Sequence, residues 1–234
     1  QFGTSGEDSV AGLVVTDDGK VVVASNENGR GVLRKFDMSA NAPTTPEWTQ
    51  DLGDLGTTGQ LTSIAYENGA IYLGGRDSSG SFDGAQGGTA YGGGPQDGFI
   101  ARYDEGASGA TKAWGTYLGG TGSDAVRGLA VDNGKVYATG ETTAALNGAT
   151  QVGAQDVFMA QFDGSSGAQE FVTQASGASG YAKGASIAVD PKGDSVLDLL
   201  GLPHGEVNAP RPPDLTARAN VRVGDYFYVS VGGG

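Results

Sequence analysis

The stretch Trp114–Thr142, WGTYLGGTGSDAVRGLAVDNGKVYATGET, contains the order of short runs and turns that decides the fold. Two apolar runs, Gly128–Val131 and Lys135–Thr139, flank the dipeptide Asn133-Gly134. Asn-Gly accepts the positive φ angles of a two-residue hairpin turn, whose twist matches that of the flanking strands. We therefore expect the end of one strand, which carries Trp114, then a glycine-rich connection and a β-hairpin.

The same order recurs along most of the chain. The first run and its turn occur four times, as Gly12–Val15 with Asp18-Gly19, Ser63–Tyr66 with Asn68-Gly69, Gly128–Val131 with Asn133-Gly134, and Ser186–Val189 with Lys192-Gly193. A third run follows as Val32–Asp37, Phe99–Asp104 and Phe158–Asp163, and a fourth carries Trp48, Trp114 or Phe171. Four short strands in roughly 50 to 65 residues are typical of a β-propeller blade.

The predicted fold is all-β, with three full blades of four antiparallel strands and a partial fourth. Apolar residues occupy both faces of the strands, as expected when each sheet is sandwiched between two neighbours. We expect a propeller segment over residues 1–200, with blades at about 3–53, 54–119, 120–177 and 178–200. A closed ring takes about four to eight blades. An open stack of three exposes blade edges and apolar faces, so another segment or subunit is expected to complete the ring.

The repeat ends after Val196, and a different module is expected at the C-terminus. Residues 201–214 read as a proline-rich linker, because four of the eight prolines lie between Pro203 and Pro213. In the second β module, 215–234, apolar and polar residues alternate from Ala217 to Val223, and Tyr226–Val231 follows a Gly-Asp turn. This pattern predicts a β-hairpin.

Composition excludes several classes of partner. The net charge of -13 opposes binding to nucleic acids and to anionic membranes. No run of about 18 apolar residues is present, so no membrane insertion is expected. The absence of cysteine excludes disulfides and thiolate metal sites, and it is ordinary for a bacterial protein outside the cell. We expect an extracellular or cell-surface location in a bacterium.

Few residues point to chemistry. The single histidine, His204, lies in the proline-flanked linker, where a catalytic triad or an ordinary zinc site is not expected. Asp37, Asp104 and Asp163 recur at one blade position, and a residue repeated in every blade serves the blade, whereas a catalytic carboxylate should break the repeat. Oxygen-rich loops could suit calcium, but the spacing of a calcium-binding loop is missing, so no cofactor is expected.

The connection Gly75–Gly98 is the longest between predicted strands and the best candidate for recognition. An aromatic residue beside carboxylates could contact a sugar or another protein. The alternative is a packed loop that covers the blade edge. The residues expected to be exposed and to bind are Arg76, Asp77, Phe82, Asp83 and Tyr91.

The run Trp114–Asp124, with Gly128–Asp132 and Val136–Thr142, resembles the bacterial seven-bladed β-propeller repeat, known as the SBBP repeat. The segment from Tyr91 to Ala101 resembles the approach of that repeat to its third strand. The resemblance covers about residues 3–190 and implies the propeller fold. Where the third copy has Asp124, the second has Gly59 and the fourth has Ala182, so this acidic position is not required in each blade.

A second resemblance lies at the C-terminus. Ser195–Pro203, with Val223–Val231, resembles large alphaproteobacterial proteins described as flagellar regulatory protein FlaEY, which implies an association with the flagellum or the cell surface. The sequence thus predicts a non-enzymatic structural or interaction module whose partners are other protein subunits or further domains of the same chain. A carbohydrate-binding propeller that takes a glycan is the first alternative, and a glycoside hydrolase is the second.

Overall fold

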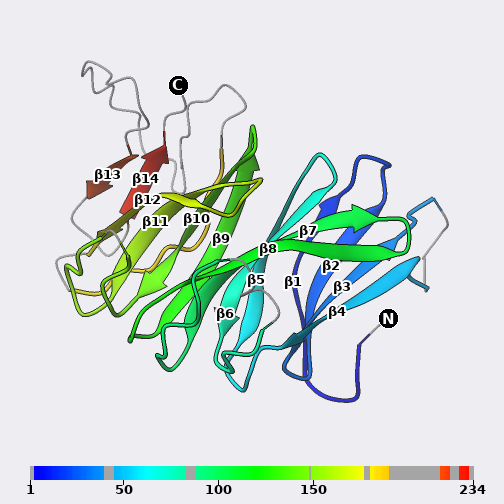
Figure 1. Ribbon diagram of the computed structural model, residues 1–234, viewed down its shortest axis with the longest axis horizontal. Helices are drawn as coiled ribbons and strands as arrows, with labels where there is room; N and C mark the ends of the chain where they lie inside the picture. The colour runs from blue at the N-terminus through cyan, green and yellow to red at the C-terminus, as the bar shows by residue number, and fades with distance from the viewer. Residues whose placement is uncertain are drawn as a thin grey trace.

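The computed structural model describes residues 3–39, 45–82, 88–147, 149–176, 180–189, 217–221 and 227–231. In these residues all regular structure is β (Figure 1). The first sheet comprises β1 (Asp8–Val15), β2 (Val21–Glu27), β3 (Arg30–Phe36) and β4 (Trp48–Asp54). The second comprises β5 (Gln60–Glu67), β6 (Ala70–Asp77), β7 (Asp97–Gly106) and β8 (Gly109–Leu118). The third comprises β9 (Asp124–Asp132), β10 (Lys135–Thr142), β11 (Asp156–Asp163) and β12 (Gln169–Ala175).

Each of the three sheets is an antiparallel meander in which strands pair in chain order. The first strand of each sheet has an irregularity at the same place: one residue is left out of the pairing with the second strand. That residue is Ala11, Thr62 or Arg127, and each is followed by the small residue of the repeat. A β-bulge adds local twist, and its recurrence shows that the three sheets are copies of one unit.

The hairpin turns follow the predicted chemistry. Asn68 and Gly69 have φ angles of 49° and 79°, and Asn133 and Gly134 have 50° and 73°. Both turns therefore have the two positive φ angles that a type I′ turn requires, which Asn and Gly adopt at low cost. In the first sheet such a turn joins β2 to β3 instead, at Asn28-Gly29, with φ angles of 49° and 80°.

The three sheets are arranged as propeller blades. Between the first and second sheets the main contacts join β1 to β5, and between the second and third they join β5 and β6 to β9. The outer strands β4 and β8 contact each other far less. The sheets therefore lie close at their first strands and spread apart toward their fourth strands. The predicted class, four-stranded antiparallel blades in an all-β chain, is confirmed.

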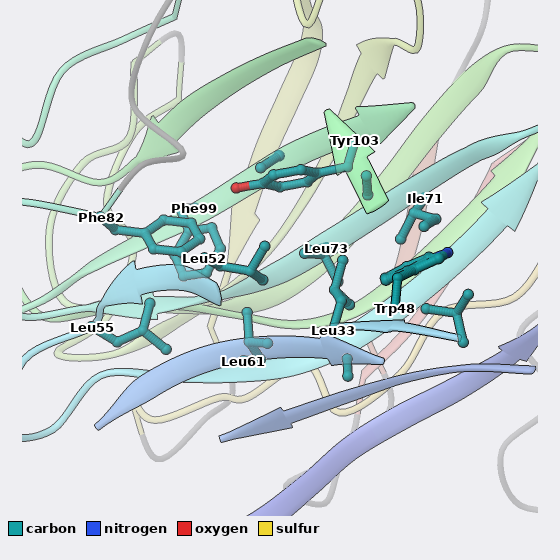
Figure 2. Close-up of a cluster of buried hydrophobic side chains, with 14 of the residues drawn as sticks. Leu33, Trp48, Leu52, Leu55, Leu61, Ile71, Leu73, Phe82, Phe99 and Tyr103 are labelled. Carbon is teal, nitrogen blue, oxygen red and sulfur yellow. The ribbon is translucent and has the colours of Figure 1, made fainter. Parts of the chain in front are cut away.

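Apolar side chains fill the space between successive blades. Figure 2 shows the cluster between the first and second blades, where Leu33 and Trp48 of the first blade face Ile71 and Leu73 of the second. A second cluster joins the second blade to the third and includes Tyr72, Trp114, Val126, Phe158 and Phe162. Burial of both faces of the second blade explains why its strands are not polar on alternate residues.

The chain after β12 begins to cover the third blade. Ile187 and Val189 pack against Tyr137 and Met159 of that blade, although the described residues 180–189 form no paired strand beyond an isolated bridge at Tyr181. At the C-terminus β13 (Ala217–Val221) and β14 (Phe227–Val231) pair as the predicted antiparallel hairpin. The predicted linker, 201–214, and His204 lie outside the described residues, and the limits given above for the domains stay predictions.

Candidate functional site: a long loop and an open blade face

The loop between β6 and β7 holds the residues that the sequence pattern favours for recognition. Arg76 is half-buried, and its guanidinium donates to the Thr58 carbonyl oxygen at 2.7 Å and to Gln60 Oε1 at 2.8 Å. Asp77 is fully buried, where its carboxylate accepts hydrogen bonds from the Ser79 amide at 2.8 Å and from the Tyr117 hydroxyl. The expectation that Asp77 is exposed is therefore wrong, because this carboxylate caps the start of the loop.

The aromatic residues of this loop also point inward. Phe82 is only 2% exposed, and its ring packs against Phe99 with the centroids 4.3 Å apart, so the expectation of an exposed Phe82 is wrong as well (Figure 2). Tyr91 is half-buried and meets Tyr117 edge to face with the centroids 5.4 Å apart. Asp83 lies outside the described residues. The sequence missed these positions because the rings that bury them, Phe99 and Tyr117, come from later strands.

The loop runs along the edge of its own blade. The Thr89 carbonyl oxygen accepts a hydrogen bond from the Tyr117 amide at 3.0 Å, and the Thr89 amide donates to Thr116 Oγ1 at 3.1 Å. A Cβ atom on Gly92 would lie 2.7 Å from the Gly120 carbonyl oxygen, so the two backbones touch. These contacts favour the interpretation that the loop covers the outer strand β8, whose edge would otherwise be open to pairing with another chain. A binding role for Arg76, Asp77, Phe82, Asp83 and Tyr91 stays a prediction.

Buried carboxylates lie where loops meet strands. Asp97 and Asp124 are fully buried, and their Oδ2 atoms accept hydrogen bonds from the amides of Gly92 and Gly120 respectively. Burial, together with the nearby carboxylates of Asp124 and Asp77, raises the pKa of Asp97 to about 6. In the third blade Asp156 accepts from two amides of the preceding loop in the same way as Asp97.

These carboxylates do not form an open acid and base pair. Each is inaccessible to a substrate, and the positions of Asp97 and Asp124 recur as Asp156 and Asp8 in other blades. Within the described part of the chain no three residues among His, Cys, Asp and Glu are grouped so that they could hold a metal ion. The arrangement is that of loop caps.

The first blade has an apolar face that nothing in the described structure covers. Val10, Leu13 and Val15 of β1 are 59%, 60% and 63% exposed, and Met38 is 52% exposed. Val10, Leu13 and Met38 line a groove of about 510 Å³ together with Val21, Val23 and Phe36. We call this surface the open face. Exposed apolar patches of this kind mark interaction sites in soluble proteins.

The same positions are covered in every later blade. Leu61 and Val126 correspond to Val10, and they are 1% and 0% exposed. Ile64 and Leu129 correspond to Leu13, and each packs against the blade that precedes it in the chain. Ile187, the next equivalent, packs against the third blade. The open face thus has the residues of a blade interface, and no described residue packs against it.

One polar pair distinguishes the open face from the inner interfaces. The Arg34 guanidinium forms an ion pair with Glu27, with Nη2 2.9 Å from Oε2, and Ser25 Oγ donates to Glu27 Oε1 at 2.7 Å. The hydrogen bond from Arg34 lowers the pKa of Glu27 more than burial raises it. At the position of Arg34 the second and third blades have Ala101 and Ala160, both fully buried. The open face therefore combines apolar residues with a buried charge pair.

Comparison with known proteins finds a relative that is much longer than this chain. The chain is similar to regulatory protein FlaEY of Caulobacter vibrioides. The two are 33% identical over an alignment of 256 residues, which covers 98% of this chain and 26% of FlaEY. The likeness thus extends over nearly the whole chain, well beyond the C-terminal stretch that suggested it. This chain spans about a quarter of the length of that relative.

No family model matches the chain, so the resemblance to the SBBP repeat stays a resemblance. Among solved structures the chain is similar to the Dos1 propeller, with a TM-score of 0.48 and 17% identity over 82% of this chain and 43% of the other. It is also similar to a glutaminyl cyclase of Myxococcus xanthus, with a TM-score of 0.27 and 15% identity over 79% and 82% of the two chains. None of the described residues forms a helix that could cross a membrane.

Proposed function

We propose that this chain is a non-enzymatic interaction module, a set of propeller blades that binds another protein subunit or a further domain of its own chain through the open face. The observation that carries the proposal is the exposure of Val10, Leu13 and Val15, whose counterparts in the second and third blades are fully or partly buried against the preceding blade. Apolar side chains at such positions gain free energy when a protein partner removes them from water.

The similarity to a protein named as regulatory supports this proposal. Together with the resemblance to flagellar FlaEY proteins, it leads us to propose a role in flagellar regulation and a secreted or cell-surface location. The acidic charge of -13 opposes nucleic acids as partners. A glycan-binding role receives less support, because Phe82 is buried and Tyr91 packs on Tyr117. A glycosidase role receives less support too, because Asp97 and Asp124 are closed to solvent.

The proposal can be tested with single cysteines, because the chain has none of its own. The variant Val15→Cys places a thiol on the open face, and Val152→Cys places one at a valine of similar exposure, 65%, on the third blade. Both are introduced into the full-length protein in the bacterium that produces it, and reaction with a maleimide is followed in intact cells. In the purified chain of 234 residues the two thiols should react at similar rates.

In cells the labelling rate of the Val15→Cys thiol should fall by at least ~10-fold, because a partner covers the thiol and labelling then requires local opening. The Val152→Cys thiol should stay reactive. Equal rates at the two positions in cells would show an uncovered face and would end the proposal. A membrane-impermeant maleimide tests the location separately, since it labels Val152→Cys in intact cells only if the protein is outside the cytoplasm.

A further inference from the structure

The open face shows which partner would fit it. Across each inner interface the first strand of one blade lies against the first and second strands of the blade before it. At the centre of the second of these interfaces is Gly74 of β6, where a Cβ atom would lie 2.7 Å from Val126 Cγ1 and 3.0 Å from Leu129 Cγ. A glycine in the second strand thus makes room for the two residues that correspond to Val10 and Leu13.

The segment that leads into β1 has the form of a connection between blades. The Thr4 amide donates to Asp8 Oδ2 at 2.6 Å, and the Gly120 amide donates to Asp124 Oδ2 at 2.9 Å, four residues apart in both cases. The Asn28 amide donates to the Glu7 carbonyl oxygen at 3.1 Å, as the Thr143 amide does to that of Ser123 at 3.2 Å.

Residues 3–8 therefore fold as residues 119–124 do, and residues 119–124 join the end of the second blade to the start of the third. This agreement argues for an occupant on the same polypeptide, because the connection is shaped to arrive from a preceding fourth strand. The relative FlaEY extends well beyond the quarter of its length that matches, which leaves room for further blades.

We propose that the open face is the docking site of a further four-stranded blade of the same repeat, carried by the same polypeptide. This inference rests on the proposed function and names its partner. The docked blade places a small residue of its second strand, equivalent to Gly74, against Val10 and Leu13. It also meets the pair Glu27–Arg34, where the inner interfaces have Ala101 and Ala160 in place of the arginine.

The pair Glu27–Arg34 makes the docked blade different from the inner ones. At this position the inner interfaces accept an alanine, whereas the open face offers a guanidinium that is 14% exposed in its side chain. Covering the ion pair of Arg34 and Glu27 with an apolar surface removes both charges from water, which costs free energy. The docking blade should therefore carry a polar group opposite Arg34, and a copy of an existing blade should dock more weakly than the natural one.

The test adds a blade to the intact chain. Residues 54–119 are duplicated and joined directly to Thr4, which reproduces the natural step from Gly119 to Gly120 in the repeat. Maleimide labelling of Val15→Cys is then compared in the extended and the original chain, with Val152→Cys as the control position. In the extended chain the labelling rate of Val15→Cys should fall by at least ~10-fold, and the labelling rate of Val152→Cys should be unchanged.

A matched variant carries Gly74→Glu in the duplicated blade alone. The added side chain would collide with Val10 and Leu13, so the labelling rate of Val15→Cys should return to that of the original chain. Hydrogen exchange of the duplicated strands checks that this blade still folds. In a second variant, Arg34→Ala and Glu27→Thr together introduce the residues that the third blade has at these positions, Ala160 and Thr142, so that no carboxylate is left buried without its cation. This double change should increase the protection of Val15→Cys in the extended chain.

An unchanged labelling rate in the extended chain would overturn the blade as partner, while protection in cells would leave the proposed interaction module standing. If Val15→Cys is protected neither in the extended chain nor in cells, both the blade as partner and the proposed interaction module are contradicted. If the original chain dimerises and Val15→Cys becomes protected as its concentration rises, the occupant is a second copy, and the proposal of a blade on the same polypeptide fails.

Discussion

Asp97 shows how the ionisation of a single buried residue affects the stability of the fold. Its carboxylate has no exposed surface, one of its oxygens has no hydrogen-bond partner among the described residues, and its pKa is raised to about 6. The unfolded chain releases this proton at the ordinary value near 3.8, so between about pH 4 and pH 6 the folded state holds more protons than the unfolded state. The contribution of Asp97 to stability is present below pH 4 and is lost as the pH rises to 6.

We therefore expect Asp97→Asn to increase the free energy of unfolding at pH 7 by about 1 to 3 kcal/mol. The asparagine keeps an oxygen that can accept from the Gly92 amide but carries no charge. Denaturant unfolding from pH 4 to pH 8 is the measurement, and the loss of stability of the parent between pH 4 and pH 6 should become smaller in the variant. Asp104→Asn, at a side chain 53% exposed, is the control that should change little.

At the scale of elements, glycines serve two separate purposes. Gly134 has a φ of 73°, and a Cβ atom there would meet nothing within 4 Å, so its role is purely conformational. Gly74 has no positive φ, and its role is to let β9 approach β6. The two kinds of glycine should respond differently to the same substitution.

Gly74→Ala and Gly134→Ala should each lower the free energy of unfolding by about 1 to 2 kcal/mol, for different reasons. The loss from Gly74→Ala should be partly recovered in the double variant with Val126→Ala, because the methyl that it strikes is removed. Gly134→Ala should show no coupling to Val126→Ala. A double-mutant cycle by denaturant unfolding measures both, and additive effects at Gly74 would contradict the close approach.

The strands could be predicted from sequence because their signals are local. Asn68-Gly69 and Asn133-Gly134 fix two hairpins whatever surrounds them, and the apolar runs beside them then have to be strands. The site could not be predicted in the same way. Phe82 looks like a loop residue until Phe99, seventeen positions later by numbering, is placed under its ring. Burial of loop residues is a tertiary property, and the sequence carries no local signal for it.

The open face could be predicted from the sequence only in part. An open stack of three blades already implies an exposed apolar face, and the alignment of the repeats pairs Leu13 with Ile64 and Leu129. What the sequence lacks is the direction of stacking. Either face of the first blade could be the open one until the contacts between β1 and β5 show which residues face the second blade.

At the scale of the whole molecule, stability depends on the contacts between blades, because each blade needs a neighbour to cover it. Lys35 forms such a joint between two blades. Its ammonium lies 2.8 Å from Asp18 Oδ2 and forms an ion pair with Glu105 of the second blade, with side chains 8% and 10% exposed. Burial alone would lower the pKa of Lys35, but Asp18 and Glu105 raise it above the usual value.

Lys35→Met should lower the free energy of unfolding at pH 7 by about 2 to 4 kcal/mol, because Glu105 loses its cation while it remains largely buried. The double variant with Glu105→Gln should recover much of the loss. Arg30→Met removes an exposed ion pair within one blade and should cost less than about 1 kcal/mol. Equal losses from Lys35→Met and Arg30→Met would contradict a joint between blades at Lys35.

The contact between two glycine-rich loops limits which substitutions homologous sequences can accept. Cβ atoms on Gly92 and Gly94 would collide with the backbone at Gly120 and Gly122, so the first loop cannot acquire a side chain at these two points while the second stays in place. Mutations in the two loops are therefore not independent. Homologous sequences that lose a glycine in 92–94 should also differ in the length or composition of 119–122. Changes in the two segments should therefore be correlated among homologues.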